Sequence, residues 1–229
     1  MADDIFREVD DDLRAERLRA LARRYVAAAV AVVAVAGAGV GGWQYHAWRG
    51  RQADRAWAAT YFTALHAADS SQIVPGETAR LTPQQQDALK RFATLDTAPP
   101  GLRTLARLER AALLASSGDT RGALSLWTQV ADDGAADPQL RSLASLLWVQ
   151  HQIDDGDPAT LRSRLTTLDG VGKPWRALAI ECEAMLDLRQ GRTADARRRF
   201  AQLSAEADVP DGLRSRAGGL LQTLNASPS

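Results

Sequence analysis

Three histidines, one cysteine and a pair of adjacent serines are the side chains of this chain that could carry nucleophilic or metal chemistry. His46, His66 and His151 share neither an i, i+4 nor an HExxH spacing, which two imidazoles need to reach one metal ion. Ser116 and Ser117 lack the flanking glycines of a nucleophile elbow, and no histidine and aspartate pattern indicates a triad. We therefore expect no catalytic residue, no metal site and no cofactor, and predict that the protein is not an enzyme.

Cys182 is the sole cysteine, so no intramolecular disulfide can form. An oxidising compartment permits disulfides without requiring them, so this count is compatible with the periplasm but does not demonstrate it. The cysteine lies on an apolar helical stripe with Trp175, Leu178, Ala179, Met185 and Leu186. This spacing predicts a packing role rather than a reactive thiol.

The first structural element that the sequence indicates is residues 25–43, a run of nineteen residues without charge. A helix of this length covers about 28 Å, which matches the hydrocarbon core of a bilayer. Tyr25, Trp43, Tyr45 and Trp48 stand where aromatic rings prefer the interface. We predict a single transmembrane helix, with the lipid bilayer as a partner. Its GxxxG pair, Gly37 and Gly41, could support a homodimer, although an incidental small-residue face is the plainer interpretation.

The flanks of this span predict its orientation. Five arginines lie between positions 10 and 24, against three (Arg49, Arg51 and Arg55) after the span, and the cytoplasmic flank carries the excess. We expect a bacterial inner-membrane protein with a cytoplasmic N-terminus and a periplasmic domain. A cleaved signal peptide is the alternative, because residues 34–36 imitate a cleavage site, but the long acidic leader argues against it. Residues 1–24 have the period of an amphipathic helix, and a solvated tail is the other interpretation.

The charge balance of the full chain excludes some classes of partner. Basic and acidic residues number 28 each, so no basic field would gather nucleic acid. Lysine occurs only as Lys90 and Lys173, which we interpret as a bias in composition rather than as chemistry. Residues 44–229 are numerous enough to form one domain with a core of its own.

Residues 44–229 have the pattern of an all-α domain. Alanine and leucine dominate, alternating β-branched runs are missing, and glycine or proline breaks recur. Thr82 with Gln85 forms a capping box, and Asp137 and Asp157 each precede a proline at the first helical position. The expected helices are 44–69, 83–96, 101–116, 120–132, 138–154, 158–168, 174–189, 193–206 and 211–225.

Three turn glycines indicate a repeat. Gly118, Gly156 and Gly191 are separated by 38 and 35 residues, close to the period of about 34 in tetratricopeptide repeats. A small residue followed four positions later by an aromatic one recurs as Ala88 and Phe92, Ala123 and Trp127, and Ala196 and Phe200, whereas the middle copy has Leu161 and Leu165. We predict a degenerate helical-hairpin solenoid.

The leader motif of residues 4–9 (DIFREV), the single span and the degenerate repeats together resemble the tetratricopeptide-like bacterial inner-membrane proteins that include the ancillary subunit of the SecYEG translocon. Residues 105–115 ending in Gly118-Asp119, and residues 174–176, resemble stretches of that family. The resemblance implies a periplasmic domain near the translocon exit. It also implies partnership with SecYEG and periplasmic folding factors, and a chaperone-like or trafficking role.

Repeat numbering from the turn glycines predicts a partner-binding groove on the first helix of each hairpin, where unfolded or amphipathic protein segments could bind. Its residues are Leu105, Leu108, Ala112, Leu143, Leu146, Gln150, Ile153, Leu178, Glu181, Met185 and Leu188. Two alternatives stay open. The register could be shifted by a position, or the helix around Trp57, Phe62 and Leu65 could cover this surface.

Three classes of function compete on this basis. The first is a membrane-tethered protein–protein interaction module beside the SecYEG translocon, assisting the trafficking or folding of secreted proteins. The second is a structural scaffold of a cell-envelope complex unrelated to secretion. An enzyme is the third and weakest, and a deep cleft with converging carboxylates or histidines would revive it.

Overall fold

The computed structural model describes residues 48, 52, 54–69 and 81–226. By its internal contacts the chain divides into two units, Met1–Ala56 and Trp57–Ser229. The predicted leader, the predicted span with its glycine pair, and His46 all lie outside the described residues. Within the described part, no helix combines the length and the apolar character that a membrane span requires.

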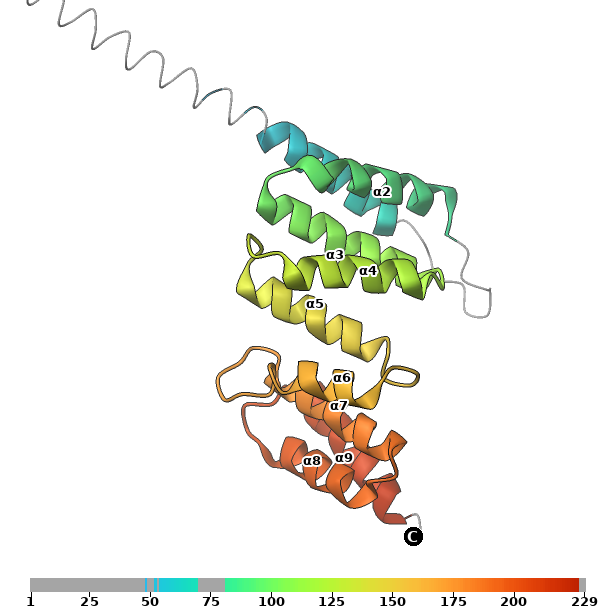
Figure 1. The fold of residues 1–229 in the computed structure, drawn as a ribbon, viewed down its shortest axis with the longest axis vertical. Coiled ribbons are helices and arrows are strands. Elements are labelled where there is room, and N and C mark those ends of the chain that lie inside the picture. The colour runs from blue at the N-terminus through green and yellow to red at the C-terminus, as the bar shows by residue number, and fades with distance from the viewer. Residues whose placement is uncertain (1–47, 49–51, 53, 70–80, 227–229) are drawn as a thin grey trace, which may run out of the picture. The chain divides into compact units, whose positions relative to one another are not determined.

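All regular structure in the described residues is helical (Figure 1). Residues 54–69 form a helix that precedes residue 81 and the labelled elements. The labelled helices are α2 (Pro83–Thr94), the 3₁₀ turn η1 (Leu95–Thr97), α3 (Pro100–Ser116), α4 (Thr120–Asp132), α5 (Pro138–Gln150), α6 (Pro158–Leu165), α7 (Arg176–Arg189), α8 (Thr193–Ala205) and α9 (Asp211–Ala226).

The all-α prediction is confirmed, and the differences lie at helix ends. Helix α5 stops at Gln150 rather than at 154, and Asp154 and Asp155 would place negative charge at the negative end of the helix dipole. Helix α6 stops at Leu165 rather than at 168. The hydroxyls of Thr166 and Thr167 there donate to backbone carbonyls of the preceding turn, which competes with helix continuation.

The predicted N-caps are present. The Thr82 hydroxyl accepts from the Gln85 amide at 3.2 Å, and the Gln85 side chain accepts from the Thr82 amide at 3.0 Å, which completes the capping box of α2. The Asp137 carboxylate caps α5, and the Asp157 carboxylate caps α6. Each carboxylate satisfies amides that the helix start would otherwise leave unbonded.

The recurring small and large pair anchors the even-numbered helices. Ala88 and Phe92 in α2, Ala123 and Trp127 in α4, and Ala196 and Phe200 in α8 are all buried. Helix α6 carries Leu161 and Leu165 in the same places, and both are completely buried. The alanine lets the neighbouring helix approach closely, and the large side chain four residues later fills the space beside it.

Four apolar clusters follow one another along the chain, each formed by consecutive helices. The first joins the 54–69 helix, α2 and α3, and the second joins α3, α4 and α5. The third joins α5, α6 and α7, and the fourth joins α7, α8 and α9. Trp148 of α5 packs against both the second and the third cluster. Helices α3, α5 and α7 therefore bury two sides each, one in the cluster before and one in the cluster after, whereas α2, α4, α6 and α8 each contribute to a single cluster.

Gly118 and Gly191 end α3 and α7 in the same way. Each adopts a positive φ, 85° and 74° respectively. After α3, the Asp119 amide bonds the Leu114 carbonyl and the Gly118 amide bonds the Ala115 carbonyl, which is a Schellman motif. The amides of Arg192 and Gly191 repeat the pattern after α7. Gly156, in the departing middle copy, does not have a positive φ.

Replacing Gly191 by alanine should destabilise the fold by about 1 kcal/mol, because an added Cβ meets open space but the positive φ is strained for any L side chain. The matched control is Gly219→Ala inside α9, where a Cβ also meets open space. That change should stabilise the fold by about 0.5 kcal/mol or more, because alanine loses less chain entropy. Urea unfolding measures both, and equal signs for the two changes would contradict this account.

Candidate functional site

The described cysteine and histidines make contacts within the fold. Cys182 is buried among Leu165, Ala179 and Leu186, which confirms its predicted packing role. Burial, with Glu181 nearby, raises the pKa of its thiol to about 12. The Nδ1 atoms of His66 and His151 each lie within hydrogen-bond distance of a backbone oxygen one turn earlier. Among the described residues, no three histidine, cysteine or carboxylate side chains are grouped to hold a metal ion.

Helix packing places the predicted groove residues in different environments. On α3, Leu105 and Ala112 are exposed, and Leu105 retains 37% of its accessible surface. On α7, Met185 retains 40%, and the other three predicted residues, Leu178, Glu181 and Leu188, are partly buried. Leu143 and Gln150 of α5 are also partly buried, as is Ile153 in the turn after it. Leu108 and Leu146 instead are buried and belong to the second and third clusters.

The exposed positions share one side of the helix array. On α3, the stripe of Leu105 and Ala112 lies between Leu113, which packs on the preceding helices, and Leu108, which packs on the following ones. The stripes of α5 and α7 lie between their own two packed sides in the same rotational sense. Within them, Leu143 also packs against the second cluster, Leu178 against the third and fourth, and Leu188 against the fourth. We name this surface the odd-helix face. Its residues are Leu105, Ala112, Leu143, Gln150, Leu178, Glu181, Met185 and Leu188.

Sequence reasoning predicted Glu181 on this face but missed its partner Arg216 and the nearby Glu109. Arg216 of α9 reaches Glu181 with two guanidinium nitrogens, at 2.6 and 2.7 Å from the carboxylate oxygens. Glu109 lies one turn after Leu105 on α3, at the edge of the stripe that faces the 54–69 helix. Burial, together with the charge of Asp69, raises the pKa of the Glu109 carboxyl. Burial and the charge of Glu109 likewise raise the pKa of the Tyr61 phenol.

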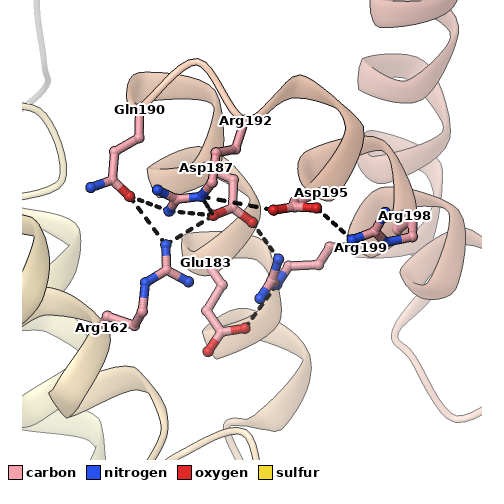
Figure 2. A network of polar contacts seen from close by, with 8 residues as sticks. All are labelled: Arg162, Glu183, Asp187, Gln190, Arg192, Asp195, Arg198 and Arg199. Atoms are coloured by element: carbon pink, nitrogen blue, oxygen red, sulfur yellow. Dashed lines mark hydrogen bonds and ion pairs between the residues drawn. The ribbon is translucent and has the colours of Figure 1, made fainter.

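A polar network on α6, α7 and α8 centres on Asp187, which has no accessible surface (Figure 2). One carboxylate oxygen accepts from Arg162 at 2.9 Å and from Arg192 at 2.7 and 3.0 Å. The other oxygen accepts from Arg199, whose Nε also donates to Glu183 at 2.9 Å. Three arginines from separate segments thus surround one buried carboxylate.

The arginine contacts of Asp187 outweigh its burial in determining the pKa of its carboxyl group. Burial alone would raise the pKa of this carboxyl, but hydrogen bonds from Arg162 and Arg192 and the charge of Arg199 outweigh it, so the pKa is lowered. The guanidinium donors that Figure 2 draws are directed at carboxylate or amide oxygens within the network. The network therefore joins α6, α7 and α8 through ion pairs.

A polar pocket of about 450 Å³ opens beside this network. Its lining residues are Asp169, Arg176, Ile180, Glu183, Asp195, Arg198, Arg199 and Gln202. Arg176 already binds Glu206 in a two-bonded ion pair at 2.6 and 3.1 Å, and Arg198 binds Asp195 at 2.5 Å. The lining carries three arginines and three carboxylates, and each of these arginines already pairs with a carboxylate.

Comparison with known proteins gives one distant relative. No protein-family model matches the chain, and no solved structure matches it. A protein of Rickettsia prowazekii (strain Madrid E), named uncharacterized protein RP231, is 26% identical over 129 residues. The match covers 54% of this chain, and the chain spans 59% of the relative. That name states no activity, substrate or partner.

Replacing Asp187 by asparagine should destabilise the fold by about 3 kcal/mol, because three guanidinium groups would lose their shared anion. The matched control is Asp211→Asn, which removes an exposed ion pair with Arg214 and should change stability by less than about 0.5 kcal/mol. Urea unfolding at neutral pH compares the two variants with the wild type.

Measuring the stability of the Asp187→Asn variant at acidic pH gives a second test. The pKa of Asp187 is lower in the folded protein than the ordinary aspartate pKa of 3.8. The carboxylate therefore makes its full contribution to the free energy of unfolding above pH 3.8, and this contribution is lost as the pH falls through the folded-state pKa. The stability difference between wild type and Asp187→Asn should therefore shrink in acid below that value. A difference that stays constant with pH would show that the carboxylate charge is not the cause.

Proposed function

We propose that this protein is a membrane-anchored, tetratricopeptide-like interaction module whose odd-helix face binds protein segments. The observation that carries the proposal is the partly exposed apolar surface of this face, to which Leu105 and Met185 contribute most. Apolar side chains left open on adjoining helices favour association with another protein. The repeated helix pairs and the two Schellman turns support the solenoid interpretation.

The cellular setting of the proposal rests on the sequence. The apolar run of residues 25–43 and its arginine-rich flank support a single-pass anchor with a periplasmic domain. The resemblance to the family of the ancillary SecYEG subunit suggests the translocon and periplasmic folding factors as partners. In this proposal, the module assists the trafficking or folding of emerging secreted proteins.

The compartment can be tested with one introduced thiol. Val171 retains 96% of its surface, whereas Cys182 is buried with a raised pKa. A membrane-impermeant maleimide should label Val171→Cys in cells whose inner membrane is intact, and should leave the wild type essentially unlabelled. Labelling that appears only after the inner membrane is lysed would place the domain in the cytoplasm.

The binding surface can be tested by photo-crosslinking in cells with the full-length protein. A benzoylphenylalanine at Leu105 or Met185 should capture SecY or periplasmic folding factors more than about fivefold above the same probe at Arg198, whose side chain is 76% exposed on α8. Equal capture at the three positions would contradict the proposed face. Capture of other envelope proteins, with no translocon subunit, would favour the envelope scaffold instead.

A further inference from the structure

Glu109 differs from the other partly buried carboxylates of the described residues. Most of the other buried or partly buried carboxylates pair with an arginine: Asp96 with Arg107, Asp133 with Arg103, Glu181 with Arg216, Glu183 with Arg199, Asp195 with Arg198, and Glu206 with Arg176. Asp169, which makes no such contact, still has Arg176 within electrostatic range. No lysine or arginine among the described residues pairs with Glu109. In a domain that neutralises its half-buried acids, this carboxylate is left without a cation.

The surroundings of Glu109 add to the cost of its charge. The charge of Asp69, another carboxylate, acts on Glu109, and the Tyr61 side chain is near enough to be affected by the charge of Glu109. A half-buried anion next to a like charge is destabilised until a cation approaches. The site therefore favours a positive group supplied from outside the described residues.

The neighbours of Glu109 along α3 are apolar and accessible. Leu105 lies one turn before it and is 37% exposed, and Ala112 lies one turn after it and is exposed. Residues at these spacings share one surface of a helix. A carboxylate between two accessible apolar side chains matches the shape of a lysine or arginine, which has an apolar stem and a charged end.

We propose that the stripe of Leu105, Glu109 and Ala112 on α3 docks a partner protein segment in which one arginine or lysine is flanked by apolar side chains. The cation binds the Glu109 carboxylate, its stem covers Leu105, and the flanking apolar residues lie along the odd-helix face toward α5. This inference rests on the proposed function, since it names the chemistry of the segment that the face binds.

The test is fluorescence anisotropy with the full-length protein in mild detergent and a short labelled peptide of alanine and leucine with one central arginine. Peptides with glutamine or glutamate in place of the arginine are the matched ligands. The arginine peptide should bind at least about tenfold more tightly than the glutamine peptide, and Glu109→Gln should remove that difference. Glu109→Lys should reverse the preference in favour of the glutamate peptide.

The control variant is Asp154→Asn, an exposed carboxylate in the turn after α5, which should leave all three affinities unchanged. Circular dichroism checks that each variant stays helical, and the charge reversal keeps the test informative because it predicts a gain of binding. An arginine preference that persists in Glu109→Gln, or equal binding of the three peptides, would overturn the docking proposal. The photo-crosslink at Met185, which lies on α7 outside this stripe, reports on the proposed function independently, so either proposal can fail alone.

Discussion

Alanine at the helix crossings determines how closely each helix of this domain approaches the next. Ala88, Ala123 and Ala196 have no accessible surface, and the ring four residues after each fills the space that the small side chain leaves. The first, second and fourth clusters contain these alanines, whereas α6 supplies Leu161 to the third. Leucines of adjacent helices meet only when the backbones are near. The surface left over on α3, α5 and α7 is in turn defined by the two sides that each of these helices must bury.

Arginine supplies the long-range polar contacts over this apolar framework. The guanidinium group of Arg189 donates to the carbonyls of Ile153 and Gly156, at 2.7 and 2.6 Å, and so ties α7 to the preceding turn. Arg216 and Arg176 each bind a carboxylate with two nitrogens. A lysine could not make these paired contacts. The scarcity of lysine, which the composition alone leaves as a bias, thus coincides with a structural use of arginine.

The helices could be predicted because their caps are local in the sequence. The candidate site could be predicted only in part, because it depends on tertiary contacts. Caps such as Thr82 and Asp137 lie beside the helices that they start, so their pattern is visible in the sequence. Leu108 and Leu146 fit the groove numbering but are buried, because helix rotation is determined by partners distant in the chain. The Asp187 network joins Arg162 and Arg199 from other helices, and Glu109 acquires its neighbours from the 54–69 helix. No short sequence motif indicates either arrangement.

Trp148 connects the two ends of the helix array energetically. Its ring packs against the second cluster and the third, and the Arg164 guanidinium lies 4.0 Å from the ring centre. In a linear array, the coupling between neighbouring units decides whether they unfold together or one after another. At this junction Trp148 acts together with other contacts among α5, the turn after it, α6 and α7, which include the buried Leu146 and Val149 and the two hydrogen bonds from Arg189. Trp148 is therefore one of the side chains that couple the unfolding of the second cluster to that of the third.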